Sequence, residues 1–169
     1  MKQQQIDIRS CEPEDYLALK DIHAQPKAIW GTLQLPFPSA ERWKKRLGER
    51  RDGAYWLVAC VDSQAVGSLG LSTVTHSPRR RHVGELGMAI HDQWQGQGIG
   101  SALMGAAINL ADLWLNLVRL ELIVFTDNMP AIKLYKRAGF EVEGTFRKFA
   151  FRDGEYIDAY AMARLGGQK

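Results

Sequence analysis

The chain has 169 residues, enough for one domain with a sizeable hydrophobic core. Its hydrophobic share of 46% and charged share of 24% are ordinary for a soluble globular protein. The net charge of +3 is compatible with an anionic ligand but too small for a typical nucleic-acid-binding domain, and no apolar run approaches the roughly 20 residues that span a bilayer. We therefore expect no nucleic-acid partner and no membrane partner.

The first fifty residues predict a short strand and two helices separated by a loop. The opening MKQQQIDIRS has no apolar stretch typical of a signal peptide, so we expect a cytoplasmic protein, and residues 6–8 alternate as in a strand. A helix follows, with Leu19 and Ile22 on its apolar face. Residues 25–39 hold three of the six prolines and predict a loop or a broken helix. Ser39 is placed to cap a charged helix that runs to about residue 50.

Three strands are predicted in the middle of the chain. Residues 55–61 and 65–75 flank a polar turn and form a hairpin, and HVGELGMAIH at 82–91 is the third strand. Cys11 and Cys60 fall in predicted strands and are too few for a disulfide framework or a zinc site, so we expect buried thiols and no metal. The basic run at 79–81 is either a solvated loop or a site for a substrate carboxylate or phosphate.

The second half of the chain predicts two helices and three strands. A long amphipathic helix follows residue 98, and RLELIVF at 119–125 is apolar enough for a strand buried on both faces. A second helix begins at Pro130 and ends at Gly139, which has the position of a left-handed cap. Two last strands, around 140–144 and 156–162, flank a turn at 152–154. The apolar positions of the long helix are Leu103, Ala106, Ala107, Leu110, Leu113, Trp114 and Leu117.

These elements predict a single α/β domain over residues 1–169, because no linker, repeat or low-complexity segment divides the chain. Their order, βααβββαβαββ, is typical of one mixed, mostly antiparallel sheet with helices on both faces.

The sequence WQGQGIGS, residues 94–101, places three glycines between a strand and the long helix. A glycine-rich turn at a helix N-terminus favours an anion, because backbone N–H groups face the ligand and no Cβ blocks a phosphate. The turn lacks the lysine of a P-loop, and a dinucleotide fingerprint would need a glycine where Ser101 stands. Gln95, Gly98 and Gly100 instead match the pattern Q/R-x-x-G-x-G/A.

That pattern and a second motif downstream resemble the Gcn5-related N-acetyltransferase (GNAT) family. The second motif is N-x-x-A-x-x-L/V-Y-x-x-x-G-F, and residues 128–140 match it at every marked position. The resemblance covers essentially the whole chain and implies the GNAT fold, whose sheet is splayed at the strand that binds the cofactor. The stretches IHAQP (22–26), TLQLP (32–36), PRRRHV (78–83) and GEYIDAYAMAR (154–164) are similar to those of bacterial L-amino acid N-acetyltransferases.

The resemblance implies transfer of acetyl from acetyl-CoA to the α-amino group of a free L-amino acid of the phenylalanine or methionine type, in a direct ternary complex. In the pyrophosphate turn, Gly98 and Gly100 would approach the ligand, while Gly96 occupies a variable position. Asn128 would bind the pantetheine arm or only cap its helix, and Lys136 would approach the 3′-phosphate of CoA or be an ordinary surface lysine. The implied cofactor-binding residues are Met88, Ala89, Ile90, Gln95, Gly96, Gln97, Gly98, Ile99, Gly100, Ser101, Asn128, Ala131 and Lys136.

Two residues are candidates for proton transfer. Tyr135 matches the family's tyrosine near the CoA sulfur and would act as general acid, although helix packing would also explain an aromatic residue there. Glu85 is the candidate general base, since apolar neighbours on a strand would raise the pKa of its carboxyl group. The alternative is a structural carboxylate paired with Arg81 or His82. His82 itself and His91 are further candidates for the base.

The acceptor pocket is expected to draw its apolar walls, Leu33, Leu35 and Phe37, from the loop at 29–37. Arg81, or a neighbour in the basic run, would bind the carboxylate of the amino acid. Gly87 is expected to mark a bulge that parts its strand from the next one.

Two other functions stay open. One is acetylation of a different amine, such as a protein N-terminus or a phosphinothricin-like analogue, and the other is a silent module that only binds acyl-CoA. The joint presence of Glu85, Asn128 and Tyr135 favours an enzyme, since a binding module needs neither acid nor base. The apolar late strands favour a homodimer.

Overall fold

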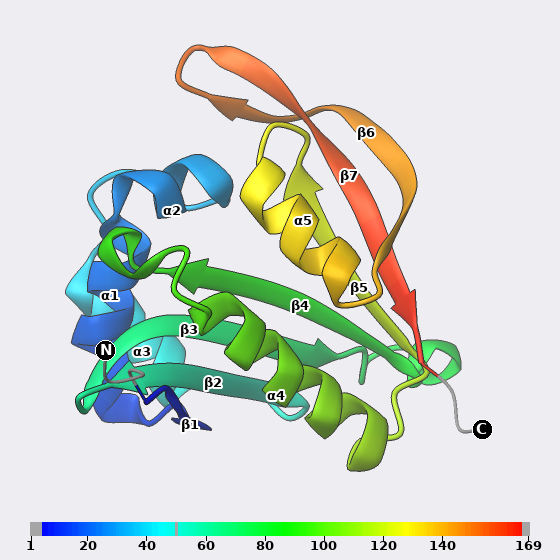
Figure 1. Cartoon of the computed structure of the whole chain (residues 1–169), viewed down its shortest axis with the longest axis horizontal. Helices are drawn as coiled ribbons and strands as arrows, with labels where there is room; N and C mark the ends of the chain where they lie inside the picture. Colours follow the sequence, from blue (N-terminus) through cyan, green and yellow to red (C-terminus); the bar gives the residue numbers. More distant parts are fainter. Residues whose placement is uncertain (1–4, 50, 167–169) are drawn as a thin grey trace.

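Seven strands form one sheet in the computed structural model, which describes residues 5–49 and 51–166 (Figure 1). The strand order is β1-β2-β3-β4-β5-β7-β6, and all neighbours are antiparallel except β4 and β5. The predicted mixed, mostly antiparallel sheet is confirmed. The strands are β1 (Asp7–Ser10), β2 (Ala54–Val61), β3 (Gln64–Thr73), β4 (Val83–Ile90), β5 (Arg119–Phe125), β6 (Glu141–Arg152) and β7 (Glu155–Leu165), and the α-helices are α1 (Tyr16–Ala24), α2 (Pro26–Gly31), α3 (Ala40–Gly48), α4 (Ile99–Leu113) and α5 (Met129–Arg137).

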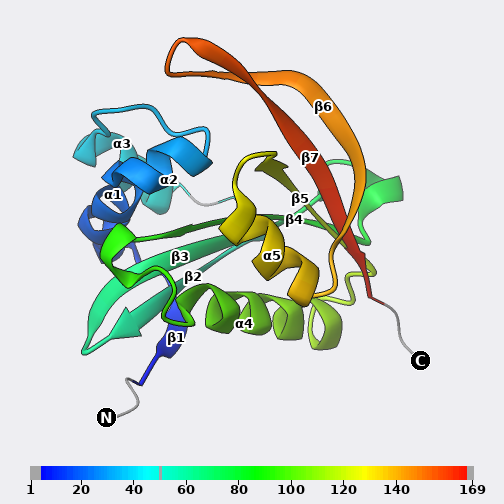
Figure 2. The ribbon, with the colours of Figure 1, turned by 45° about the horizontal axis from the view of Figure 1, so that its top comes forward.

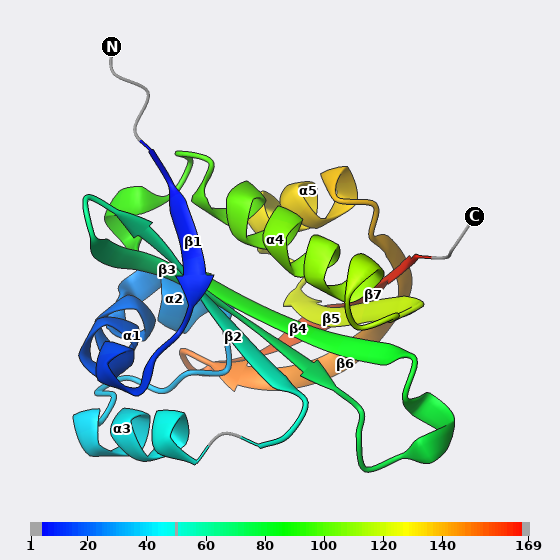
Figure 3. The ribbon, with the colours of Figure 1, turned by 90° about the horizontal axis from the view of Figure 1, so that it is seen from below.

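Helices cover both faces of the sheet, as Figure 3 shows. α4 and α5 lie on one face, where Leu69 of β3, Leu103 of α4 and Leu120 of β5 belong to a single buried cluster. α1, α2 and α3 lie on the other face, where Leu19 and Trp43 pack in a smaller cluster. Burial of apolar side chains on both sides fixes the central strands, and these strands carry the site. None of the helices in the described part of the chain is long and apolar enough to cross a membrane.

β4 and β5 are joined at only one end. Their parallel register runs from Val83 opposite Arg119 to Glu85 opposite Glu121 and goes no further, although β4 continues to Ile90. On its other side β4 pairs with β3 from Gly84 to Ile90 without a register shift, so Gly87 forms no bulge in that ladder. The expected parting of β4 from its neighbour occurs on the side of β5, after Glu85. Backbone groups of β4 beyond residue 85 therefore face a gap rather than β5.

The hairpin of β6 and β7 is a long arm that curves above the gap and leans towards α2 (Figure 2). Arg152, the last residue of β6, joins the arm to the rest of the molecule. Its Nη1 donates to the carbonyl oxygen of Trp30 at 2.9 Å, its guanidinium lies 3.7 Å from the centre of the Trp30 ring, and it forms an ion pair with Asp127. The side chain is 14% exposed, so this ion pair is better shielded from solvent than an ordinary surface pair.

α2 lies on the side of the gap towards which the arm leans (Figure 2). Its residues fall inside the segment 25–39, which the sequence predicts as a loop or broken helix. Pro26 takes a first-turn position of this short helix. Asp92, from the turn after β4, accepts a hydrogen bond from the Lys27 backbone N–H at 3.1 Å. A carboxylate at a helix N-terminus is favourable, so this contact fixes α2 beside the end of β4. The predicted order is thus correct apart from one added helix.

Two predictions of burial are wrong. α4 ends at Leu113, and Leu113 and Trp114 are 71% and 76% exposed. β5 is not buried on both faces along its whole length, since Ile123 is 52% exposed, although Phe125 on the same face is buried. The side chains of α4 that are buried are Ile99, Leu103, Met104, Ala107 and Ala111. Both cysteines, Cys11 and Cys60, are buried as expected.

Candidate active site

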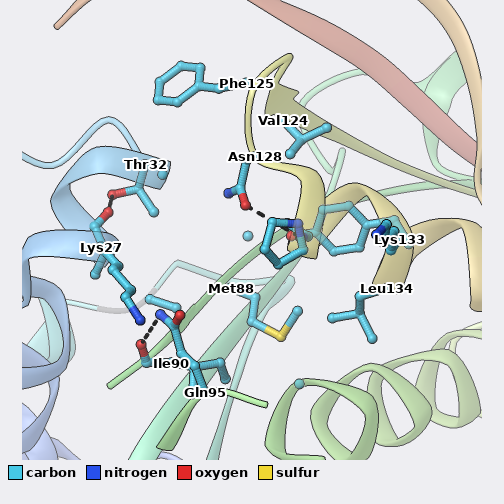
Figure 4. Close-up of a pocket in the computed structure, with 18 of the residues that line it drawn as sticks. Lys27, Thr32, Met88, Ile90, Gln95, Val124, Phe125, Asn128, Lys133 and Leu134 are labelled. Atoms are coloured by element: carbon cyan, nitrogen blue, oxygen red, sulfur yellow. Dashed lines mark hydrogen bonds between the residues drawn. The ribbon is translucent and has the colours of Figure 1, made fainter. Parts of the chain in front are cut away.

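A cavity of about 620 Å³, here called the cleft, opens where β4 and β5 diverge (Figure 4). It is lined from both faces of the sheet. Met88 and Leu134 line it on the side of α4 and α5, whereas Gly87 and Ile123 line it on the side of α1, α2 and α3. The cleft therefore passes through the sheet, and two molecules could enter it from opposite faces.

The glycine turn forms the first mouth of the cleft. Gly98 is the N-cap of α4 with φ of +86°, and Gly96 also has a positive φ of +75°. The first N–H groups of a helix have no intrahelical partner, and here they belong to residues 99–101. The turn thus offers unpaired donors at the positive end of a 15-residue helix, which is an anion-binding arrangement.

The structural reasons for Gly96 and Gly100 differ from those expected from the sequence. Gly96 stands at a variable position of the motif, yet its positive φ strains any other L-residue. Gly100 is needed for space, because a Cβ there would lie 3.0 Å from the Leu134 side chain. A close approach between α4 and α5 therefore explains this glycine as well as a ligand does.

The glutamines of the turn hold its shape. Gln95 lines the cleft, and its Nε2 donates to the carbonyl oxygen of Ile90 at 3.4 Å, which ties the turn to the end of β4 (Figure 4). Gln97 folds back to donate to the Gln93 carbonyl oxygen at 2.9 Å and does not line the cleft. Ile99 is 2% exposed and belongs to the core. Gln97 and Ile99 could therefore contribute only backbone groups to a ligand.

β4 provides the middle of the cleft. Met88, Ala89 and Ile90, three of the residues expected to bind the cofactor, all line it. Gly87 faces open space, with no atom within 4 Å of the position where a Cβ would lie. Because β4 has no partner strand on this side, its peptide groups are available to bind amides of a ligand.

α5 forms the facing wall. The Asn128 Oδ1 accepts a hydrogen bond from the Ala131 backbone N–H at 3.4 Å, so the capping role considered for Asn128 is present. Asn128 and Ala131 both line the cleft. Lys136 does not line it, whereas Lys133 does, opposite Lys27 of α2 (Figure 4). Arg137, one helical turn from Lys133, lines the cleft too.

Tyr135 is 8% exposed and lines the cleft. Burial raises the pKa of its phenol to about 12. No hydrogen bond to its hydroxyl is formed by any side chain or backbone group in the described ranges. The hydroxyl is therefore a neutral donor without a protein partner, which suits contact with a bound molecule.

Glu85 lies at the closed end of the gap and does not line the cleft. It is exposed, so the expected apolar surroundings are wrong. It shares a sheet face with Gly87, and its neighbours across the strands are Ser72 and Glu121. Neither structural pairing considered for it, with Arg81 or with His82, occurs among the described salt bridges.

The basic run lies far from the glycine turn. Arg79 to Arg81 occupy the loop before β4, at the opposite end of the sheet from residues 94–98 (Figure 1). Arg80 forms an ion pair with Glu121, and Arg81 is exposed outside the cleft. His91, one of the histidines considered as the base, does not line the cleft. Its Nδ1 accepts a hydrogen bond from the Gln93 N–H at 3.3 Å, and its Nε2 lies 3.4 Å from Asp21.

The predicted acceptor walls divide between two cavities. Leu33 lines the cleft and also a second cavity of about 610 Å³, here called the loop cavity. Leu35 and Phe37 line only the loop cavity, and they are 75% and 97% exposed. Trp43 and Arg46 of α3 line the loop cavity as well; the sequence indicated only a charged helix there. Within residues 5–49 and 51–166, no group of three or more metal-ligating side chains is placed to hold a metal ion.

Comparisons with known proteins agree with this geometry. The model of the acetyltransferase (GNAT) family matches residues 17–140. The L-amino acid N-acetyltransferase AaaT of Escherichia coli K12 is 49% identical over 95% of this chain and 98% of its own length, and the spermidine N(1)-acetyltransferase of the same strain is 28% identical over 93% and 84%.

Solved structures show the same fold. A GNAT-family acetyltransferase from Streptococcus pneumoniae superposes with a TM-score of 0.81 at 28% identity, covering 96% of this chain and all of that one. A Salmonella typhimurium structure assigned as an acetyltransferase, with its cofactor acetyl-CoA, gives 0.82 at 19% identity, covering 95% and 93%. Because the family model matches most of this chain, the chain belongs to the GNAT family and is an acetyltransferase that transfers acetyl from acetyl-CoA to an amine.

Proposed function

We propose that this enzyme acetylates the α-amino group of free L-amino acids with apolar side chains, of the phenylalanine or methionine type. The observation that carries the proposal is the cleft that passes through the sheet, with an anion-binding turn at one mouth and apolar residues at the other. Leu33, Ile123 and Phe125 belong to the second mouth. The 49% identity to an enzyme named as an L-amino acid N-acetyltransferase supports this acceptor class.

Acetyl-CoA would enter at the glycine turn. The N–H groups at the start of α4 would bind its pyrophosphate, and the pantetheine arm would lie along the unpaired edge of β4 between Met88 and Ile90. Lys27, Lys133 and Arg137 line the same cavity and carry the positive charge that the phosphates need. Lys133 and Arg137 are better placed than Lys136 for the 3′-phosphate, because they line the cleft.

The chain's own groups would serve the two proton transfers of amide formation. The acceptor must lose a proton to attack the thioester carbon, and Glu85, on the sheet face of the second mouth, would take it directly or through water. A backbone N–H of β4 would stabilise the oxyanion. The Tyr135 hydroxyl would donate a hydrogen bond to the departing thiolate.

A direct transfer from acetyl-CoA to the acceptor follows from the same arrangement. No cysteine lines the cleft in the described part of the chain, and Cys11 and Cys60 are buried under α1 and α3. Both substrates would therefore be bound together, each through its own mouth.

The test is a panel of acceptors assayed with acetyl-CoA by release of the free thiol. The panel holds the L-amino acids, spermidine and short peptides with free N-termini, with mass spectrometry of the products. We expect N-acetylphenylalanine or N-acetylmethionine as the main product. Activity on spermidine or peptides alone would assign another amine, and acetyl-CoA binding without any product would make the protein a silent binding module.

A further inference from the structure

Arg46 of α3 is an exposed residue whose guanidinium lies against two aromatic rings. Its guanidinium lies 5.1 Å from the centre of the Trp43 ring and 4.7 Å from that of Trp56. No described carboxylate forms a salt bridge with it, whereas Arg152 and Arg80 pair with aspartate or glutamate.

Arg46 is exposed overall, but the packing of its guanidinium against the two rings removes part of its hydration. Burial lowers the pKa of Arg46 itself, and its positive charge adds to the burial that lowers the pKa of His23 to about 4. Even a partial loss of hydration is unfavourable for a charge unless an opposite charge compensates it. Two aromatic ring faces attract the guanidinium but leave its N–H groups without a carboxylate. An anionic ligand would supply the negative charge and the hydrogen-bond acceptors for these N–H groups.

A strip of bare sheet leads from Arg46 to the cleft. Trp56 of β2, Gly70 of β3 and Gly87 of β4 are opposite one another in the strand register, so they share one face. The Trp56 ring covers Gly70, whose added Cβ would lie 3.6 Å from the ring. Gly87 faces open space and lines the cleft. No side chain of β3 or β4 at this level stands between Arg46 and the cleft.

The length of this strip suits an α-amino acid. Two interstrand spacings separate Trp56 from Gly87, which is about 9.5 Å. A guanidinium-to-carboxylate hydrogen bond spans about 3 Å, the path from a carboxylate oxygen to the α-nitrogen about 3 Å, and an attacking nitrogen stands about 3 Å from the carbon it attacks. The sum of these lengths is close to the spacing between Trp56 and Gly87, and this agreement is the basis for placing the carboxylate of an acceptor at Arg46 and its amine at the cleft.

The loop cavity gives the side chain of such an acceptor an apolar surface. Leu33, Leu35, Phe37 and Trp43 are among the residues that line it, and Leu33 is shared with the cleft. Its charged lining residues are Arg42, Lys45, Arg46 and Glu49. An apolar group attached to the same carbon as the amine and the carboxylate could therefore contact Leu33 and the rings beside Arg46.

We propose that Arg46, held between Trp43 and Trp56, binds the carboxylate of the amino-acid acceptor and selects α-amino acids over amines that lack this group. The assignment rests on the proposed function. It replaces Arg81, which lies in the basic run at the far end of the sheet. Because the bond to the carboxylate is made equally in the ground and transition states, Arg46 acts on KM more than on kcat.

The test compares Arg46→Gln and Arg46→Lys with the wild type on L-phenylalanine and on L-phenylalanine amide. Lys44→Gln is the matched control, since Lys44 is exposed on the same helix and lines neither cavity. Arg46→Gln should raise the KM for phenylalanine about 10- to 100-fold, the loss typical of a charge-assisted bond, with kcat nearly unchanged. Arg46→Lys should give a smaller rise, because a bidentate contact is lost while the charge stays. The KM for the amide should not change in either variant.

An unchanged KM for phenylalanine in Arg46→Gln, or an equal rise for acid and amide, would overturn the assignment. If thermal melting shows that Arg46→Gln does not fold, Arg46→Lys decides: a rise for the acid alone supports the assignment, and no rise overturns it. A wild type that acetylates spermidine but neither phenylalanine nor methionine overturns the proposed function, and this inference with it. A wild type active on phenylalanine whose Arg46 variants are equally active overturns this inference alone.

Discussion

At the residue scale, burial of Tyr135 bears on the role proposed for its phenol. Its pKa is raised to about 12, whereas a thiol leaving group has a pKa of about 8.5 to judge by cysteine. Full proton transfer from the phenol to the thiolate would therefore be uphill. The hydroxyl is better suited to stabilise the developing thiolate by a hydrogen bond, with the proton reaching the sulfur from solvent.

Tyr135→Phe should lower kcat about 10- to 100-fold, the equivalent of one charge-assisted hydrogen bond, with the Kd of acetyl-CoA within twofold of wild type. The active form is the neutral phenol, and a raised pKa keeps it neutral as pH rises. The wild-type pH–rate profile should consequently show no alkaline fall from Tyr135 below about pH 11. A fall near pH 9 to 10 that disappears in Tyr135→Phe would contradict this role.

Glu85 is the second residue whose role activity measurements must decide, because it is exposed and lies just outside the cleft. Glu85→Gln should lower kcat/KM by about 10²- to 10⁴-fold if the carboxylate takes the amine proton. Glu121→Gln is a matched control one strand away, since the Glu121 carboxylate is already paired with Arg80 and Arg119. A rate near that of wild type for Glu85→Gln would remove Glu85 from the mechanism.

At the scale of elements, the turn before α4 needs glycine for two reasons, backbone conformation and space, which the sequence alone could not separate. Gly96 and Gly98 both have positive φ, but only Gly98 is the N-cap that aims the first N–H groups of the helix. Gly100 has ordinary helical geometry and is small because Leu134 lies against it. The motif spacing predicted where a phosphate would bind, whereas the structure shows that backbone conformation requires Gly96 and Gly98 and that packing against Leu134 requires Gly100.

Gly98→Ala and Gly96→Ala should therefore destabilise the fold alike, by about 1 kcal/mol each, because both force an L-residue into the left-handed region. Gly98→Ala should in addition raise the Kd of acetyl-CoA about tenfold, and Gly96→Ala should raise it much less. Urea unfolding and calorimetric titration with acetyl-CoA measure the two effects separately. Equal losses of affinity in the two variants would show that the whole turn, not the helix cap, sets binding.

For the remaining elements, the sequence predicted the features that depend on nearby residues, such as the ends of helices, and missed those that depend on contacts between distant segments. Ser39 caps α3 through a hydrogen bond from the Arg42 N–H, and Gly139 ends α5 with φ of +91°, both as expected from the sequence. The 3–4 spacing of apolar residues in α4 continues past its end, which is why Trp114 was wrongly placed on the buried face. The exposure of Ile123 depends on the gap between β4 and β5, which no local pattern contains.

At the scale of the whole molecule, the proposed function depends on the cleft between β4 and β5, and contacts on both sides of this cleft hold the two parts of the sheet in place. α4 packs against β2 and β3, while Arg152 ties the arm of β6 and β7 to Trp30 and Asp127 across the cleft. Arg46 illustrates the limit of sequence analysis, because Trp43 is its neighbour on the helix but Trp56 comes from another element. The exposed Phe146, Phe151 and Tyr156 lie on the arm, and the homodimer favoured by the sequence stays a prediction.

The central claim is that acetyl-CoA and an amino acid meet in one cleft that crosses the sheet. Initial rates measured with both substrates varied, using L-phenylalanine or L-methionine as acceptor, test it most directly. Double-reciprocal lines that intersect are predicted, because both substrates must be bound before acetyl moves. Parallel lines, together with an acetylated protein detected by mass spectrometry before acceptor is added, would indicate a covalent intermediate and contradict the account.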